Sequence, residues 1–260
     1  MGQETSPLQT LAEADQAYAL VGGGGPSLGI LLQYPGFVID AAARTVAMAL
    51  RSDAGVASPG ATGISVIGSG NYATAVLIPV FKQAGARLRS VASGAGVSGL
   101  HSARKFQFEE TTTDTERLFT DADTGALVIT TRHDSHARYV LKAIESGKHV
   151  FVEKPLCLTL DEQEQIESAI AARQAGGETV PMLMVGFNRR FAPQVKRLKQ
   201  LLTATVGPKA FVMTVNAGAI PADHWTQDLE VGGGRIVGEA CHFIDLLRFL
   251  SGSPVVAWED

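Results

Sequence analysis

Short β-rich runs alternate regularly with helical stretches from residue 61 to residue 186, and this alternation constrains the fold more than any other feature. Such a pattern is typical of a parallel sheet whose strands are joined by crossover helices. The sequence therefore predicts an α/β fold with a Rossmann doubly wound parallel sheet over 61–186. Strands are expected at 64–67, 88–92, 126–130, 149–152 and 182–185, and helices at 72–84, 98–105, 116–119, 136–146 and 160–174.

The residues after 186 follow a different pattern. A basic helix is expected at 194–202, a strand at 210–215, an apolar helix at 239–250 and a last strand at 255–258. Two strands are marginal as an independent sheet. We therefore expect 187–260 to be an incomplete α/β second domain of a chain that is truncated at its C-terminus.

The composition excludes several classes of protein. The chain has 260 residues, of which 45% are hydrophobic, and this is enough for a packed core. Twenty-two Lys and Arg against 26 Asp and Glu give a net charge of -4, without the basic excess that nucleic-acid binding needs. No uninterrupted apolar run predicts a membrane span, and the acidic N-terminus does not fit a secretion signal. The only two cysteines, Cys157 and Cys241, indicate a cytoplasmic protein.

The segment Gly68-Ser-Gly-Asn-Tyr-Ala73 follows the first expected strand and opens the first expected helix. In this G-x-G-x-x-A pattern the first glycine permits a tight turn, the second lets the backbone approach a pyrophosphate, and the small alanine lets the helix pack on the strand. The N-terminus of the helix offers free N–H groups to phosphates. In this context the pattern favours a dinucleotide-binding turn over an ordinary glycine turn.

The end of the second strand bears on which dinucleotide is bound. NAD sites usually have an acidic residue about 20 positions after the glycine turn, where it holds a ribose hydroxyl. This chain has Ser93 there, and Arg104 and Lys105 follow on the next helix. NADP is therefore as consistent with the sequence as NAD. The two basic residues suit a solvated helix face equally well.

The segment Gly147-Lys-His-Val-Phe-Val-Glu-Lys-Pro155 ends an apolar strand with a carboxylate, an ammonium and a proline. In a doubly wound sheet the carboxyl ends of the strands face the ligand crevice. Lys154 is then placed to stabilise negative charge on a substrate oxygen or to relay a proton. Pro155 fixes the backbone after it, with a cis bond as one option. Taken alone, Glu153 and Lys154 also fit a surface ion pair.

These segments, together with Thr130-Thr-Arg-His-Asp-Ser-His136 and Gly232-Gly-Gly-x(7)-His242-Phe-Ile-Asp245, resemble the Gfo/Idh/MocA oxidoreductase family over about residues 62–260. The resemblance implies a dinucleotide-binding Rossmann domain at 61–186 and a partial C-terminal substrate domain at 187–260, whose sheet, when complete, forms a homo-oligomer. It implies hydride transfer between NAD(P) and a secondary alcohol carbon of a sugar or cyclitol. It places the catalytic residues at Lys154 and His242. It implies that the cofactor is bound by Gly68, Ser69, Gly70, Asn71, Tyr72, Ser93, Thr130, Thr131, His136, Glu153 and Lys154.

Two departures from the family pattern put the substrate and the proton relay in doubt. The family commonly has an aspartate four residues before its histidine, where this chain has Gly238 with Glu239 beside it. Many members have Thr-Pro-Asn where this chain has Thr131-Arg-His133. Two alternatives therefore stay open: a regulator that binds a dinucleotide or sugar without catalysis, and an NAD-dependent glycoside hydrolase. Because the second domain is cut off, this piece is also expected to bind cofactor but to be nearly inactive by itself.

For other residues near these motifs, the sequence does not separate a functional role from a structural one. Asp245, one helical turn after His242, is placed either to orient the imidazole or to lie on the helix surface. Arg189 and Arg190 suit either an anionic substrate or a solvated hinge. We expect no metal site, because the histidines of the segment 133–136 have no cysteine near them. Cys241 lies in an apolar helix, where free cysteine is usually a small core residue.

The N-terminal segment 1–60 stands apart from the alternation. A helix is expected at 8–20 and a strand at 28–33. The segments Glu13-Ala-Asp-Gln-Ala-Tyr18 and Ser27-Leu-Gly-Ile-Leu-Leu-Gln-Tyr-Pro35 resemble the C-terminal end of a medium-chain, zinc-type alcohol dehydrogenase domain. The resemblance implies a fusion in which such a domain precedes residues 61–260, and a chance match of helix and strand is the alternative.

Overall fold

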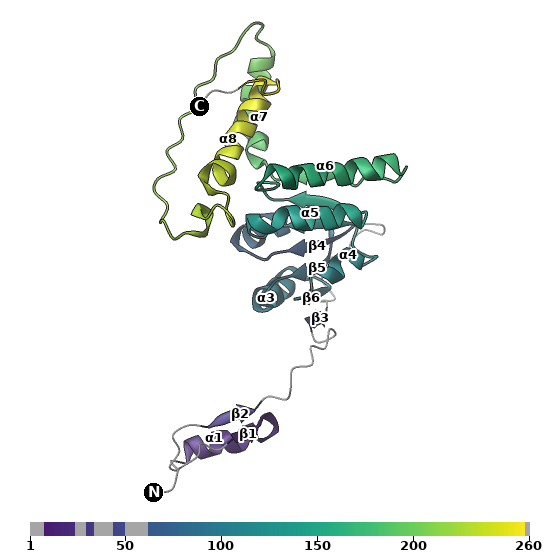
Figure 1. Cartoon of the computed structure of the whole chain (residues 1–260), viewed down its shortest axis with the longest axis vertical. Helices are drawn as coiled ribbons and strands as arrows, with labels where there is room; N and C mark the ends of the chain where they lie inside the picture. The colour runs from purple at the N-terminus through teal and green to yellow at the C-terminus, as the bar shows by residue number, and fades with distance from the viewer. Residues whose placement is uncertain (1–7, 24–29, 34–43, 50–61, 258–260) are drawn as a thin grey trace. The chain divides into compact units, whose positions relative to one another are not determined.

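A computed structural model describes residues 8–23, 30–33, 44–49 and 62–257. It divides the chain into two compact units, Met1–Ala43 and Arg44–Asp260 (Figure 1).

The smaller unit pairs two short parallel strands. The helix expected from residue 8 is wrong at its start, because the first residues form a strand. There the backbone N–H and the hydroxyl of Thr10 both donate to the Glu13 carboxylate, each at 2.9 Å, and the chain turns before the helix begins. The strand expected at 28–33 is confirmed for its second half, and residues 28 and 29 lie outside the described part. The elements are β1 (Leu8–Thr10), a 3-10 turn (Leu11–Glu13), helix α1 (Ala14–Gly22) and β2 (Leu31–Gln33).

The larger unit is built on a seven-stranded sheet with the order β3-β6-β5-β4-β7-β8-β9. All neighbouring strands are parallel except β3, which runs antiparallel to β6. The strand order reverses between β4 and β7, the place where doubly wound sheets bind ligands. The expected doubly wound sheet is thus confirmed. Its strands are β3 (Thr45–Ala47), β4 (Gly63–Ile67), β5 (Arg87–Ala92), β6 (Glu110–Thr112), β7 (Ala126–Ile129), β8 (His149–Val152) and β9 (Leu183–Val185).

Helices cover both faces of this sheet (Figure 1). The side chains of β7 show the two-residue period, since Leu127 and Ile129 enter one hydrophobic core and Val128 enters the other. Helices α4 (Glu116–Thr120), α5 (His136–Glu145) and α6 (Leu160–Ala175) cover the first core. A π-helical segment (Ala73–Leu77), α2 (Ile78–Gln83) and α3 (Val97–Phe106) cover the second.

Two strands of this sheet were not expected from the sequence. Strand β6 reads Glu-Thr-Thr, so it lacks the apolar run that marks a buried strand, yet all three of its residues are buried. Strand β3 pairs with its outer edge and lies within the segment that was expected to stand apart. The compact unit that holds the sheet begins at residue 44 and so includes β3.

The residues after β9 contain helices where helices were expected. A π-helical segment (Ile236–Ala240) leads into α8 (Cys241–Ser251), and α7 (Pro193–Thr203) packs against α8. The strand expected at 210–215 is wrong, because these residues have no regular structure and find no pairing partner among the described residues. Residues 255–257 likewise form no strand, and residue 258 lies outside the described part. Strand propensity without a partner strand does not form a sheet.

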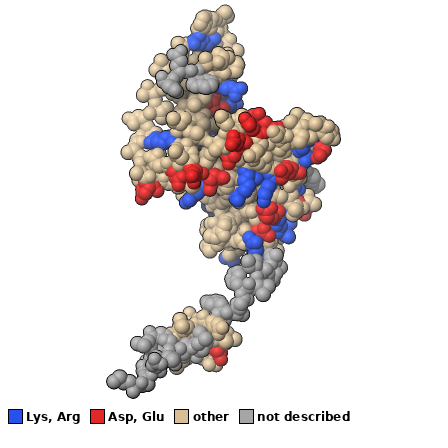
Figure 2. Space-filling model, viewed as in Figure 1, with Lys and Arg blue, Asp and Glu red and all other residues tan. Residues whose placement is uncertain are grey.

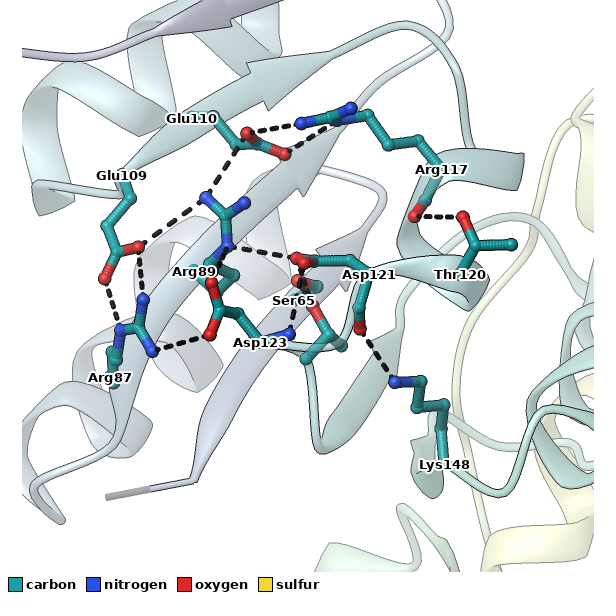
Figure 3. A network of polar contacts seen from close by, with 11 residues as sticks. Ser65, Arg87, Arg89, Glu109, Glu110, Arg117, Thr120, Asp121, Asp123 and Lys148 are labelled. Atoms are coloured by element: carbon teal, nitrogen blue, oxygen red, sulfur yellow. Dashed lines mark hydrogen bonds and ion pairs between the residues drawn. The ribbon is translucent and has the colours of Figure 1, made fainter. Parts of the chain in front are cut away.

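An ion-pair network lies at the amino ends of the central strands, opposite the ligand edge (Figure 3). The Arg89 guanidinium lies 3.2 Å from the carboxylate of Glu110 and 3.0 Å from that of Asp121. Arg87 binds Glu109 through two hydrogen bonds. The network ties β5 to the start of β6 and to the loop before β7.

Charged side chains of both signs lie next to one another on the face of this unit seen in Figure 2. Within the described residues, no helix combines the length and the apolar character that crossing a bilayer requires.

Candidate nucleotide and substrate site

The glycine loop joins the carboxyl end of β4 to the helix after it. Gly68 has a φ of 98°, and a Cβ at this position would lie 2.8 Å from the carbonyl oxygen of Thr130, so only glycine fits. The Thr130 hydroxyl donates to the carbonyl oxygen of Gly68 at 2.9 Å. The ends of β4 and β7 are thereby held together at the point where the strand order reverses.

Gly70 shows that the loop leaves room for a ligand. A Cβ on Gly70 would meet no atom within 4 Å, and the backbone here borders a cavity. The helix that starts beyond the loop is π-helical at Ala73–Leu77, a local widening that is frequent at functional sites. Its first N–H groups face the same edge as Gly70, which suits a pyrophosphate.

The cavity has a volume of about 400 Å³ and lies at the carboxyl ends of β4, β7 and β8. Nine of the expected site residues line it: Gly70, Asn71, Tyr72, Thr130, Thr131, His136, Glu153, Lys154 and His242. Gly68, Ser69 and Ser93 do not line it. The Ser69 hydroxyl donates to Ser98 at 2.9 Å, and the Ser93 hydroxyl accepts the Gly99 N–H at 3.0 Å at the start of α3.

Lys154 and His242 meet in this cavity although they come from different parts of the chain. Lys154 follows β8, and its ammonium donates to the carbonyl oxygen of Gly238 at 2.6 Å. The bond Lys154-Pro155 is cis. Burial, together with the positive charges of Lys154 and Arg189, lowers the pKa of His242 to about 4. His242 is therefore a neutral imidazole at pH 7, and its buried Nδ1 has no hydrogen-bond partner among the described residues.

Glu153 contributes a second buried polar atom without a partner. Its Oε1 makes no hydrogen bond within the described part of the chain, and burial raises the pKa of the carboxyl. Gly186 leaves the space for this carboxyl, since a Cβ on Gly186 would lie 2.6 Å from Oε1. Glu153 and Gly70 line the same cavity, and a buried carboxyl oxygen without a partner is consistent with a site for a polar ligand.

His136 is completely buried and braces the backbone around the cavity. Its Nδ1 lies 2.7 Å from the carbonyl oxygen of Pro155, and its Nε2 lies 3.1 Å from that of Thr131. Burial lowers the pKa of His136, so the neutral ring donates to one of the two carbonyl groups. The expected cofactor residue thus connects the loops after β7 and β8.

His133 occupies the place where the family pattern differs from this chain. Burial lowers the pKa of His133 to about 4, and its Nδ1 lies 2.8 Å from the carbonyl oxygen of Gly232. A neutral ring donates from Nδ1, which leaves Nε2 as an acceptor. The ring packs edge-on against Trp225 with centroids 4.9 Å apart.

The two departures from the family pattern are in contact with each other. A Cβ on Gly238 would lie 3.3 Å from Cε1 of His133 and 2.8 Å from the Gly232 carbonyl oxygen that His133 binds. Glu239 does not take the place of the absent aspartate, because its carboxylate binds Arg235 at 2.7 Å and borders another cavity. The histidine at 133 and the glycine at 238 are therefore coupled, because a side chain at 238 would collide with the His133 ring and with the carbonyl group that the ring binds.

The remaining sequence candidates near His242 are engaged elsewhere. The Asp245 carboxylate is bound by two hydrogen bonds from Arg190, and no hydrogen bond joins it to the imidazole of His242. The Arg189 guanidinium lies over the Phe243 ring at 4.5 Å. Burial raises the pKa of the Cys241 thiol, which opposes a role as a nucleophile at pH 7.

Sequence reasoning missed two residues that line the cavity. The Asn188 side chain donates to the Tyr72 hydroxyl at 2.9 Å and joins the loop after β9 to the glycine loop. Its position after an expected strand was the only signal for it. Trp225 lies in a 3-10 turn (Trp225–Gln227) within an irregular stretch, and only its contact with His133 brings it to the site. No local pattern identifies such a residue.

Comparisons with known proteins agree with this geometry. Residues 62–177 match the Gfo/Idh/MocA model, described as an oxidoreductase family with an NAD-binding Rossmann fold. The scyllo-inositol 2-dehydrogenase (NAD(+)) of Bacillus subtilis is 31% identical over 158 residues, which are 60% of this chain and 43% of that protein. The 1,5-anhydro-D-fructose reductase of Ensifer adhaerens is 29% identical over 199 residues, which are 74% of this chain and 57% of that protein.

Solved structures show the same similarity. The crystal structure of an oxidoreductase domain protein from Kribbella flavida superposes with a TM-score of 0.60 at 26% identity, covering 74% of this chain and 54% of that one. This chain spans about half the length of the curated relatives it matches. Residues 62–177, which contain the glycine loop and most of the doubly wound sheet, match the Gfo/Idh/MocA oxidoreductase family and have the NAD-binding Rossmann fold that describes it.

Proposed function

We propose that the protein is an NAD(P)-dependent oxidoreductase acting on a secondary alcohol carbon of a sugar or cyclitol. The observation that carries this proposal is that Lys154 and His242 line the same cavity as the glycine loop. The names of the Bacillus subtilis and Ensifer adhaerens relatives, an inositol dehydrogenase and an anhydrosugar reductase, support the substrate class. All cofactor contacts and catalytic roles below are part of the proposal.

The residues of the cavity divide into a nucleotide part and a reaction part. Gly70 and the helix start beyond it would hold the pyrophosphate, and Glu153 offers an unpartnered carboxyl oxygen to a polar group of the cofactor. A bound nicotinamide supplies the carbon that accepts or donates hydride. Tyr72, fixed by its hydrogen bond from Asn188, closes the side of the cavity next to the glycine loop.

Lys154 and His242 would handle the proton and the charge on the substrate oxygen. Because the pKa of His242 is about 4, the imidazole is neutral at pH 7 and can accept the hydroxyl proton during oxidation. The Lys154 ammonium, held at the Gly238 carbonyl, can stabilise the negative charge that develops on that oxygen. In the reverse direction the protonated His242 would return the proton to the substrate oxygen while Lys154 stabilises the charge on that oxygen.

The test combines nucleotide binding with turnover of a panel of cyclitols and sugars that includes scyllo-inositol. NADH and NADPH fluorescence report nucleotide binding, and absorbance at 340 nm reports hydride transfer, both measured on the complete protein. Lys154→Met should lower the turnover number by about 100-fold or more while nucleotide binding persists. Lys196→Met is the matched control, because Lys196 is exposed on α7 and does not line the cavity.

Three outcomes would contradict the proposal. Turnover by Lys154→Met at the wild-type rate would remove Lys154 from the reaction. Rapid nucleotide exchange without turnover of any panel member would favour a non-catalytic binding protein. NAD released only on denaturation, together with glycosidase activity and no net redox change, would favour a glycoside hydrolase.

Assembly and compartment are also part of the proposal. The family resemblance supports a homo-oligomer formed through the sheet of the second domain, and size-exclusion chromatography with light scattering tests it. Both cysteines are free thiols in the structure, which is consistent with a reducing cytoplasm. The N-terminal fusion and the domain boundary at residue 187 stay predictions.

A further inference from the structure

Strand β3 brings an arginine to the ligand edge of the sheet. Because β3 is antiparallel to β6 with Thr45 opposite Thr112, the preceding residue, Arg44, lies beside Thr113 at the carboxyl end of β6. The Arg44 guanidinium donates from Nη2 to the Thr113 carbonyl oxygen at 3.0 Å and from Nε to the Thr113 hydroxyl at 3.4 Å. The side chain is thus anchored through the guanidinium while it stays exposed.

This position adjoins the loop that follows β5. The Ser93 N–H donates to the Thr112 carbonyl oxygen at 3.2 Å, and a Cβ on Gly96 would lie 3.2 Å from the methyl group of Thr113. In a doubly wound fold the adenosine ribose of a dinucleotide binds at the end of the second strand of the nucleotide unit, which here is β5. Arg44 is therefore on the far side of β6 from the expected ribose site, and Thr112 and Thr113 connect the two positions.

The chemistry around this loop suits a phosphate better than a bare ribose hydroxyl. Residues 93–98 read Ser-Gly-Ala-Gly-Val-Ser, so there is no carboxylate to hold a 2′-hydroxyl or to repel a 2′-phosphate. A Cβ on Gly94 would meet no atom within 4 Å, which leaves open space beside the loop. The acidic residue next to Thr113 in sequence, Asp114, accepts a hydrogen bond from the Glu116 N–H at 3.2 Å at the start of α4.

The basic residues singled out from the sequence are less well placed than Arg44. Arg104 and Lys105 lie in the last turn of α3, about 10 Å along the helix from its first residue. The Lys105 ammonium lies over the Phe106 ring, 5.0 Å from its centroid. Their side chains therefore belong to the opposite end of α3 from the expected ribose.

We propose that Arg44 binds the 2′-phosphate of the adenosine ribose, so that the protein prefers NADP(H) to NAD(H). The inference rests on the nucleotide site of the proposed function. A planar guanidinium that keeps free N–H groups can form charge-assisted hydrogen bonds with phosphate oxygens. The preference would differ from the NAD(+) in the name of the Bacillus subtilis relative.

The experiment measures nucleotide affinity, so it does not depend on the substrate. Calorimetric titration of the full chain with NADPH, NADH, 2′,5′-ADP and 5′-AMP gives the affinity ratio within each pair. Wild type should bind NADPH and 2′,5′-ADP at least tenfold more tightly than their partners. Arg44→Ala should lower both ratios by tenfold or more, and Arg44→Lys should retain part of the preference because it keeps the charge.

Arg104→Ala is the matched control and should leave both ratios unchanged. A thermal melt of each variant shows whether β3 still folds onto the sheet, and the Arg44→Lys result separates lost charge from lost structure. If wild type binds NADH as tightly as NADPH, or if Arg44→Ala keeps the wild-type ratios, the Arg44 inference is wrong while the nucleotide site stands. If no nucleotide binds at all, the proposed function itself fails.

Discussion

Restoring the aspartate of the family pattern at position 238 should destabilise this protein. A Cβ there would lie 2.8 Å from the backbone oxygen of Gly232 and 3.3 Å from the His133 ring, so neighbouring atoms must move. Overpacking of this kind costs about 1–3 kcal/mol. Breaking the hydrogen bond between His133 and Gly232 costs about another 1 kcal/mol. We expect Gly238→Asp to lower the free energy of unfolding by about 2–4 kcal/mol.

Urea denaturation monitored by tryptophan fluorescence measures this loss, with Gly70→Ala as the control. A Cβ on Gly70 meets no atom within 4 Å, so that variant should keep or slightly gain stability while it weakens nucleotide binding. The double variant His133→Asn/Gly238→Asp should recover at least about 1 kcal/mol relative to the sum of the single changes, because the smaller side chain releases the Gly232 carbonyl. A Gly238→Asp variant as stable as wild type, or strictly additive losses, would refute the reasoning that His133 and Gly238 are coupled.

Three further predictions concern ionisable side chains of the cavity and of the ion-pair network. Lys154→Met should raise the pKa of His242 above about 4, because it removes a nearby positive charge, and the imidazole resonances in an NMR titration measure the change. An unchanged pKa would show that the charge of Lys154 does not contribute. The free energy of unfolding should fall as the pH is lowered from about 6.5 to about 4. In this range the unfolded chain binds protons at His133 and His242, whereas the folded chain keeps both rings neutral. Above about pH 6.5 these two groups should not change the stability. Urea titrations at pH 7 and pH 4.5 test this, and His133→Asn should lose less stability between the two than wild type does. Arg89→Met should lower the free energy of unfolding by about 3 kcal/mol, because the carboxylates of Glu110 and Asp121 lose the guanidinium that lies between them. Nucleotide affinity should not change at temperatures where the variant is folded. A melting temperature equal to that of wild type would contradict the predicted loss of stability.

The central strands and the glycine loop could be predicted because their signals are local. Runs such as 126–129 are short and apolar, and Gly68 and Gly70 stand between a strand and a helix. The two motif residues Lys154 and His242 could be paired only through the family resemblance, because 87 residues separate them and no periodicity connects them. The structure brings both to the same cavity.

Other parts depend on tertiary contacts that no local pattern contains. Strand β6 has three polar residues, and its burial follows from the partners on either side of it. The role of Glu239 also needed the structure, since only the position of Arg235 shows that its carboxylate is occupied. Conversely, the strand expected at 210–215 had a suitable composition but found no partner among the described residues.

Strand β3 matters for where the gene can be trimmed. A truncation designed at residue 60, the limit of the recognisable alternation, would remove Thr45–Ala47 and leave the outer backbone groups of Glu110–Thr112 unpaired. An open strand edge is a template for pairing with another molecule. Such a shortened protein should be prone to aggregate during expression, whereas a version that starts before Arg44 keeps the backbone of Glu110–Thr112 paired with β3.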